Sequence, residues 1–112
     1  LGMGRVYYKP QQHPDGRVEI PIQTIEDDAR NDAKTALASE NVNIRAVAVD
    51  SQGQTFVSLD KNGNPLHPAI IWYDSRAAQQ AERFNAACLA AAGTGPPHKP
   101  GAIDTTPKIL WL

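Results

Sequence analysis

Apolar residues recur at intervals of three and four positions in two long stretches, which is the spacing of one face of an α-helix. The first stretch covers 24–39, where the hydroxyl of Thr24 can cap the helix and carboxylates follow in the first turn. The second begins at Asp74 or Ser75, either of which can act as a cap, and continues to about Ala91. The pattern therefore predicts two amphipathic helices.

Shorter apolar runs before and between these helices predict β-strands. Residues 44–49 are almost continuously apolar, which suits a strand that is covered on both faces, as in a parallel sheet. Residues 55–59 and 69–72 are typical of the two arms of a hairpin, because an Asn-Gly pair lies in the turn at 60–65. A further short strand is expected at 5–8. A helix followed by a buried strand indicates an α/β fold.

The C-terminal part of the chain is predicted to be a loop followed by a helix. Gly and Pro are frequent over 93–101, and 106–112 begins like a helix with Pro107 in its first turn. The chain then ends on an Ile-Leu-Trp-Leu run, which is unusually apolar for the end of a finished domain. Because the chain also starts at Leu1 rather than Met, we expect it to be part of a longer protein.

Length and composition limit the classes of function. The 112 residues suffice for one domain or part of one, and the hydrophobic fraction of 41% is ordinary for a folded chain. A formal net charge of -1 provides no basic surface for nucleic acid, and no apolar run has the length needed to cross a membrane. The single cysteine, Cys88, excludes an intrachain disulfide and favours a cytoplasmic location. The three histidines lie in loops without further ligands at suitable spacing, so no metal site is predicted.

Polar residues follow two of the predicted strands and form a candidate ligand site. Gln52, Gly53 and Gln54 come after the strand at 44–49, and a Trp-Tyr-Asp-Ser-Arg sequence comes at the end of the strand at 69–72. In open α/β sheets, ligands bind beyond the carboxyl ends of the strands, where such groups converge. Each residue type also has a simpler interpretation. Gly and Gln mark turns, tryptophan is often a core residue, aspartate caps helices, and arginine is solvated in a first helical turn.

Several motifs, taken in order, carry a resemblance to a known family. They are the Ile-Arg-Ala-Val-Ala-Val-Asp-Ser-Gln-Gly-Gln-Thr segment at 44–55, the segment from Leu59 to Arg76, Thr94-Gly95, and the final Thr-Pro-Lys-Ile-Leu-Trp-Leu. Together they resemble the N-terminal domain of the FGGY carbohydrate kinases, which include xylulokinase and glycerol kinase. The resemblance implies an α/β fold that is part of an actin-like, ribonuclease-H-like ATPase domain, with a mixed sheet and flanking helices.

The resemblance also implies an activity and the residues that serve it. The activity is transfer of the γ-phosphoryl group of ATP, assisted by Mg²⁺, to a hydroxyl of a sugar or polyol. An amide side chain can donate to and accept from such a hydroxyl at once, and a tryptophan offers a flat face to the carbon skeleton. The substrate-binding residues that the resemblance implies are Gln52, Gly53, Gln54, Trp72, Asp74 and Arg76.

The same resemblance implies that essential elements lie elsewhere. The Asp-x-Gly-Thr hairpin that handles phosphate, the catalytic aspartate and the adenosine-binding segments have no match in 1–112. ATP and Mg²⁺ are therefore expected in the parent kinase and not on this part alone, which should be inactive by itself. Its expected partners are a small-molecule sugar or polyol, the remainder of the kinase and further copies of itself. The alternative hypothesis is a non-catalytic sugar-binding or oligomerising remnant without kinase activity.

Overall fold

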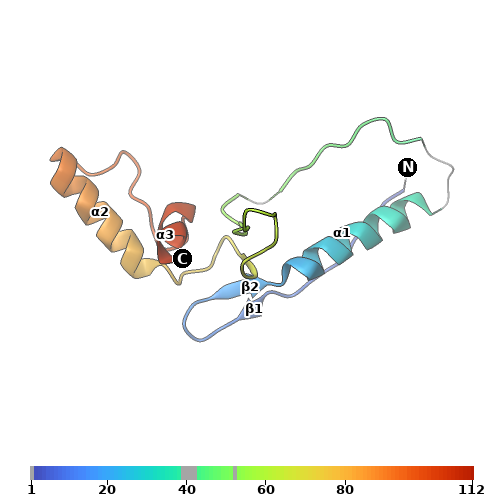
Figure 1. Ribbon diagram of the computed structural model, residues 1–112, viewed down its shortest axis with the longest axis horizontal. Helices are drawn as coiled ribbons and strands as arrows, with labels where there is room; N and C mark the ends of the chain where they lie inside the picture. Colours follow the sequence, from blue (N-terminus) through green and yellow to red (C-terminus); the bar gives the residue numbers. More distant parts are fainter. Residues whose placement is uncertain (1, 39–42, 52) are drawn as a thin grey trace.

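A small antiparallel sheet lies at the centre of the molecule, and the two long helices extend from it in opposite directions (Figure 1). The computed structural model describes residues 2–38, 43–51 and 53–112. The sheet has the order β1-β2-β3, with strands at Gln11–Gln12, Val18–Ile20 and Ala69–Ile70. All pairing among these strands is antiparallel. The parallel arrangement expected for 44–49 is therefore not found in the described part of the chain.

The hairpin between β1 and β2 turns at an Asp-Gly pair. Gly16 has a φ of 88°, a left-handed conformation that glycine adopts without steric cost. The amide of His13 donates to the carbonyl of Arg17 at 2.9 Å and closes the turn. This geometry fixes a register in which Gln12 lies opposite Val18.

The second hairpin is present as predicted on either side of the Asn-Gly turn. Phe56 and Ile70 exchange both backbone hydrogen bonds, at 3.1 and 2.9 Å. In the turn, the carboxylate of Asp60 accepts hydrogen bonds from the amides of Asn62 and Asn64, both at 2.8 Å. The side chain of the first turn residue thus satisfies backbone donors that would otherwise need a strand partner.

The helix predicted at 24–39 is observed as α1, at Ile22–Leu37. Its N-cap is Pro21, and no side chain caps it, so the expected capping role of Thr24 is wrong. The helix starts earlier in the sequence than predicted, because proline already has the φ that a helix needs and has no amide hydrogen to satisfy. None of its described residues is buried, so α1 gains little from tertiary packing.

The two C-terminal helices, α2 at Ala78–Ala92 and α3 at Thr105–Trp111, pack against each other. α2 begins later than predicted, because its N-cap is Ala77 and not Asp74 or Ser75. It ends at Gly93, which has a left-handed φ of 67° and is typical of helix C-termini. No helix in the described ranges is long and apolar enough to cross a membrane.

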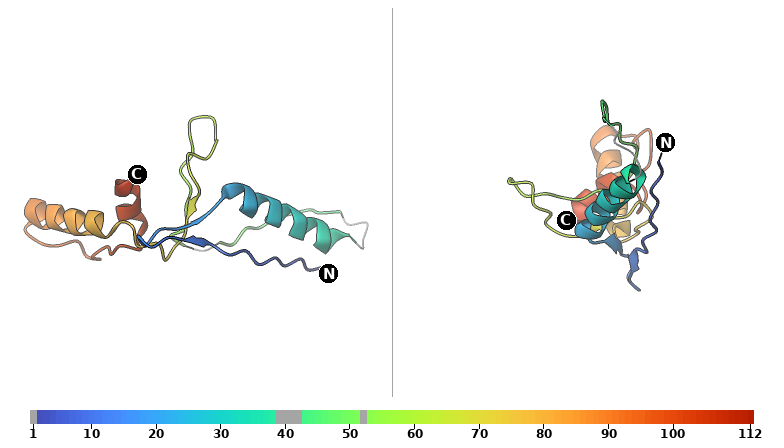
Figure 2. Two further views of the ribbon diagram at one scale, coloured as in Figure 1. Left: turned by 90° about the horizontal axis from the view of Figure 1, so that it is seen from below. Right: turned by 90° about the vertical axis from the view of Figure 1, so that its right-hand side faces the viewer.

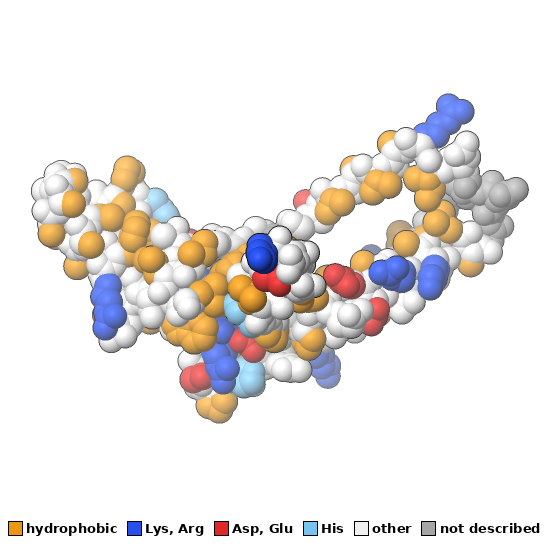
Figure 3. Space-filling view, viewed as in Figure 1, with side chains coloured by type: hydrophobic (Ala, Val, Ile, Leu, Met, Phe, Trp, Pro, Cys, Tyr) orange, Lys and Arg blue, Asp and Glu red, His pale blue; other side chains and the backbone are white. Residues whose placement is uncertain are grey.

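Two predicted strands are wrong. Residues 44–49 and 5–8 are irregular, and the pairing expected near the N-terminus occurs instead at 11–12. Val47 and Val49 are 83% and 87% exposed. In Figure 3 the arm that carries 43–51 stands away from the rest of the molecule, with hydrophobic side chains along it. A strand needs a neighbour for its amides and carbonyls, and the described residues place none beside this arm.

The hydrophobic core is small and lies at the sheet. It is a cluster of Val18, Ile20 and Ile71, against which Ile25 and Tyr73 pack. The radius of gyration is 18.5 Å, against about 13 Å for a compact domain of this length. The longest extent is 61 Å, and Figure 2 shows α1 and α2 at opposite ends of this long axis. The sheet and α3 therefore carry most of the tertiary contacts that position a site.

Candidate functional site

The two parts of the predicted site come together at the base of the second hairpin. The amide of Trp72 donates to Oγ1 of Thr55 at 3.0 Å. This bond joins the segment that follows β3 to the turn that contains Gly53 and Gln54. Gln52, the remaining member of the predicted turn, lies outside the described residues.

Gln54 has an unusual backbone conformation. Its φ is 63°, and it is the single non-glycine residue with a positive φ in the described ranges. This conformation costs an L-residue about 1 to 2 kcal/mol, and such strain is typical of ligand-binding turns. Gly53 and Gln54 are both exposed, and a Cβ placed on Gly53 would meet no atom within 4 Å. The turn therefore leaves both residues accessible from solvent.

Trp72 occupies the centre of a tight turn. The amide of Asp74 donates to the carbonyl of Ile71 at 3.0 Å, which places Trp72 and Tyr73 between them. The two rings meet edge to face, with centroids 5.1 Å apart and planes at 77°. Tyr73 packs against the core, whereas Trp72 is 44% exposed. Trp72 therefore has a packed edge and an accessible surface at the same time.

Asp74 is fully buried and serves as a hub of hydrogen bonds. Its carboxylate accepts from the amide of Val18 on β2 and from the amide of Arg76 at 3.0 Å. Nε and Nη2 of Arg76 donate to the same carboxylate, the shortest contact being 2.7 Å. The interpretation of Asp74 as the cap of α2 is wrong, because its oxygens bind these other donors.

Arg76 is also buried, and two carboxylates bind it. Its side chain is 4% exposed, and Nη2 lies 2.7 Å from Asp74 and 2.7 Å from Oε1 of Glu19 on β2. The interpretation of Arg76 as a solvated first-turn residue is therefore wrong. The side chains of Asp74, Arg76 and Glu19 link the segment before α2 to β2, the central strand of the sheet. Their charged groups bind one another.

The ionisation of this network follows from burial and pairing. Burial raises the pKa of Asp74, but the hydrogen bonds and charge of Arg76 and the amide of Val18 outweigh it and leave that pKa below its ordinary value. Burial lowers the pKa of Arg76, but Asp74 and Glu19 more than offset this and raise it. Both groups are charged at neutral pH.

Helix α3 contributes a lysine that the sequence analysis did not single out. Lys108 is fully buried, and its Nζ donates to the carbonyl oxygens of Ile71 and Trp72, both at 2.9 Å. Burial lowers the pKa of Lys108, although the nearby charge of Asp74 opposes this shift. The lysine therefore binds the backbone of the same turn that presents the tryptophan.

Arg76 connects the network to α3 as well. Its guanidinium carbon lies 4.8 Å from the centroid of the Trp111 ring, a cation–π arrangement. Lys108 and Trp111 are three positions apart, so they share one face of α3. That spacing indicates the shared face from the sequence, but not the groups that the face contacts. The contribution of Glu19 had no comparable signal, because it depends on a contact between distant parts of the chain.

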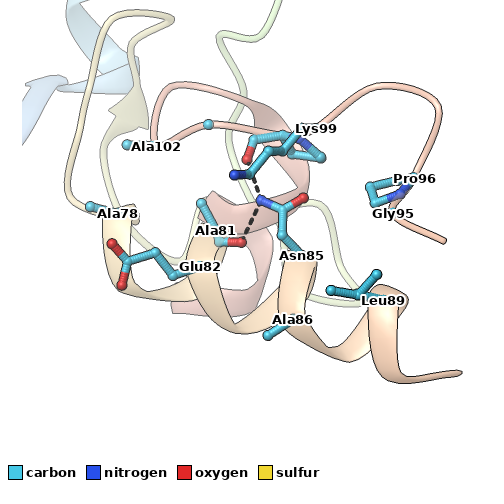
Figure 4. Close-up of a pocket in the computed structure, with 12 residues that line it drawn as sticks. Ala78, Ala81, Glu82, Asn85, Ala86, Leu89, Gly95, Pro96, Lys99 and Ala102 are labelled. Carbon is cyan, nitrogen blue, oxygen red and sulfur yellow. Dashed lines mark hydrogen bonds between the residues drawn. The ribbon is translucent and has the colours of Figure 1, made fainter. Parts of the chain in front are cut away.

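A separate groove lies between α2 and the loop that follows it (Figure 4). It has a volume of about 700 Å³ and contains none of the predicted site residues. The side chain of Asn85 connects α2 to the following loop, because its Nδ2 donates to the carbonyls of Ala81 at 2.8 Å and Pro100 at 2.9 Å. Small apolar side chains make up most of its wall. This groove is thus distinct from the Trp72 turn.

The described residues do not form a metal site. In the ranges that the structure covers, no three His, Cys, Asp or Glu side chains converge as ion ligands. Asp74 and Glu19 already bind Arg76, which leaves their oxygens unsuited to a hydrated Mg²⁺ ion.

Comparison with known sequences gives consistent similarities. The model of the FGGY family of carbohydrate kinases, N-terminal domain, matches residues 7–112. The chain is 32% identical over 116 residues to a glycerol kinase of Thermococcus onnurineus, an alignment that covers 100% of this chain and 23% of that protein. It is 39% identical over 71 residues to a xylulose kinase of Streptomyces coelicolor, covering 60% of this chain and 14% of the relative. The chain thus spans about a quarter of the glycerol kinase.

The fold is similar to a solved structure. A crystal structure of a xyloylose kinase from Brucella ovis superposes with a TM-score of 0.74 at 23% identity, covering 98% of this chain and 23% of that one. This likeness confirms the predicted α/β class and its place in an actin-like ATPase fold. The strand pairing of the described residues is antiparallel and less extensive than the mixed sheet that we predicted.

Proposed function

Because this chain belongs to the FGGY family of carbohydrate kinases, we propose that it supplies the sugar-binding face of an ATP-dependent sugar or polyol kinase. The observation that carries the proposal is the hydrogen bond from the amide of Trp72 to Thr55, which brings the backbone of the exposed Trp72 to the residue that follows the exposed Gln54. Such a pair suits a ligand that has a carbon face and hydroxyl groups. The reaction is transfer of the γ-phosphoryl group of ATP to one of those hydroxyls.

The six predicted residues take different parts in this proposal. Gln54 donates to and accepts from a hydroxyl, and Gly53 allows the ligand to approach the backbone closely. Trp72 covers the carbon face. Asp74 and Arg76 act indirectly, because they are buried and bound to each other, and they hold the turn that presents the indole. Gln52 stays a predicted ligand contact outside the described residues.

ATP, Mg²⁺ and the base that accepts the hydroxyl proton enter through other parts of the kinase. Phosphoryl transfer needs a metal-bound nucleotide and a positioned carboxylate. The buried carboxylates of this region are occupied by Arg76, and the relatives are about four times as long as this chain, which spans 23% of the glycerol kinase. We therefore expect the chain alone to show no phosphotransfer with ATP, Mg²⁺ and glycerol or xylulose.

Ligand binding to the chain itself tests the proposal. Glycerol and xylulose are titrated while the midpoint of thermal unfolding and the heat of binding are measured, because a ligand of the folded state raises that midpoint. We expect stabilisation by at least one of them and its loss in Gln54→Ala and Trp72→Ala. Tyr7→Ala is the matched control, since Tyr7 is an exposed aromatic residue outside the turn. Equal responses in all four chains would contradict the proposal.

The exposed arm favours a second candidate function, self-association. Ile44, Val47 and Val49 are all exposed, and their backbone has no strand partner in the described residues. Such a segment is a template for pairing with another chain. In sedimentation velocity over a range of concentrations, the wild-type chain should form dimers or larger species. Val47→Lys combined with Val49→Lys should shift it toward monomer, and an unchanged distribution would exclude this function for the arm.

A further inference from the structure

We propose that Lys108 is a positioning residue for the sugar site, because it fixes the backbone of Trp72 and thereby the orientation of the indole face. The proposal rests on the proposed function, in which Trp72 covers the ligand. Lys108 itself is fully buried on α3 and would not touch the sugar. It acts through two hydrogen bonds, from Nζ to the carbonyls of Ile71 and Trp72.

The burial of this lysine needs a specific explanation. Moving an ammonium group out of water is costly unless its donors are satisfied, and lysine is rarely buried without a paired carboxylate. In the described residues no carboxylate lies within 4 Å of Nζ, and carbonyl oxygens are its partners instead. A methionine or leucine would fill the same space at lower cost. The two carbonyl contacts are what distinguishes lysine from such a side chain.

These contacts restrain the Trp72 peptide from both sides. The amide of Trp72 donates to Thr55 at 3.0 Å, and its carbonyl accepts from Lys108 at 2.9 Å. The turn that follows is closed by Asp74, whose amide binds Ile71. With both polar groups of its backbone bound, the Trp72 peptide cannot rotate without breaking one of these hydrogen bonds, of which the bond from Lys108 is partly buried. The two hydrogen bonds therefore restrain the backbone that carries the exposed indole.

Helix α3 restrains the end of the same segment. The Trp111 ring lies against the guanidinium of Arg76 at 4.8 Å, and Arg76 in turn binds Asp74. One face of α3 thus holds the segment at Trp72 and at Arg76. A ligand site gains affinity when its contact residues are held in the productive geometry before binding. This is the role that the geometry assigns to Lys108.

Fluorescence of Trp72 provides a direct test. In a Trp111→Phe background, which keeps an aromatic ring beside Arg76, Trp72 is the sole tryptophan. The measurements are acrylamide quenching without ligand and the fluorescence response to glycerol and xylulose. Lys108→Met keeps the aliphatic stem and removes both donors. We expect it to increase quenching of Trp72 and to weaken ligand binding about tenfold, as small displacements in a site do.

Matched variants separate positioning from general damage. Lys61→Met removes an exposed lysine in the Asn-Gly turn and should change neither readout. Lys108→Arg keeps cationic donors and should restore quenching and affinity to within about twofold of the parent. If Lys108→Met does not fold by circular dichroism, Lys108→Arg decides. A folded Lys108→Arg chain whose Trp72 is quenched as freely as in urea would overturn the proposal.

The outcomes distinguish this inference from the function on which it rests. If the parent shows no response to either ligand, the proposed function fails, and the quenching data still report whether Lys108 restrains Trp72. If the parent binds a ligand and folded Lys108→Met binds it equally well with unchanged quenching, the sugar site stands and the positioning role of Lys108 is wrong.

Discussion

The segment 69–76 and the arm 43–51 contain similar apolar runs in opposite surroundings. Ile70 is completely buried and pairs with Glu19 of β2 on one side and with Phe56 on the other, whereas Val49 is 87% exposed. The first segment has amide and carbonyl partners from β2, Phe56 and α3. The arm has no strand partner in the described residues. The difference shows that an apolar run becomes ordered structure here only where other residues satisfy its backbone.

The Asp74 network should be the most sensitive part of the ordered segment. Asp74→Asn removes one of the two carboxylates that bind Arg76 and should lower the free energy of unfolding by about 3 to 4 kcal/mol, because the buried cation keeps only Glu19 as a charged partner. Urea unfolding followed by circular dichroism measures this loss. Asp15→Asn, in the exposed Asp15–Arg17 ion pair, should leave the urea midpoint unchanged. Similar midpoints for both variants would contradict the difference between buried and exposed pairs.

A pair of truncations compares the two regions directly. Ile70→Ala should lower the free energy of unfolding by about 3 kcal/mol, because it leaves a cavity in a fully buried position. Val49→Ala should change it by less than about 0.5 kcal/mol, because little surface is buried there. Both values come from the same urea titration. If Val49→Ala were as destabilising as Ile70→Ala, the arm would have a packing partner in solution.

Acid should weaken the ordered segment through Asp74. The pKa of its carboxyl is lowered below the ordinary 3.8 in the folded chain. Its contribution is therefore fully present above the pKa of the unfolded chain and is lost as the pH falls through the lower folded value. We expect the urea midpoint of the wild-type chain to fall more steeply than that of Asp74→Asn below about pH 4. Parallel curves for the two chains would show that another carboxylate is responsible.

The smallest expected effect concerns the turn that joins the arm to the site. Gln54→Gly should raise the free energy of unfolding by up to about 1 kcal/mol, because glycine tolerates the positive φ at this position. Thermal unfolding measures the gain. Gln54→Ala is the matched control, since it removes the amide and keeps the strained backbone. Equal stability of the two variants would indicate that the φ of 63° carries no cost.

Local signals in the sequence predicted the second hairpin and the approximate positions of the helices. The Asn-Gly and Asp-Gly turns and the left-handed Gly93 depend on neighbouring residues alone, so their structures could be predicted from them. The start of α2 could not, because Asp74 binds Val18, 56 positions away, and does not cap the helix. The prediction of a strand at 44–49 was wrong for a related reason. Its pattern specifies a buried strand but not the neighbour that would cover it.

Only part of the candidate site could be predicted from the sequence. The resemblance indicated Trp72 and the 52–54 turn, and the structure brings Thr55 to Trp72. The buried state of Asp74 and Arg76 could not be predicted, because it depends on Glu19 and α3. Lys108 was part of a recognised motif but had no evident role until its carbonyl partners were known.

The bond between Asp74 and the amide of Val18 also has a consequence for folding kinetics. It spans 56 positions, and the Lys108 contact to Trp72 spans 36, whereas both hairpins close over short distances. Long loops close slowly and at a greater entropic cost, so the hairpins and helices should form first and the network last. Contacts that form after the transition state affect mainly the unfolding rate. We therefore expect loss of the Asp74 hydrogen bonds to accelerate unfolding and to leave the folding rate unchanged.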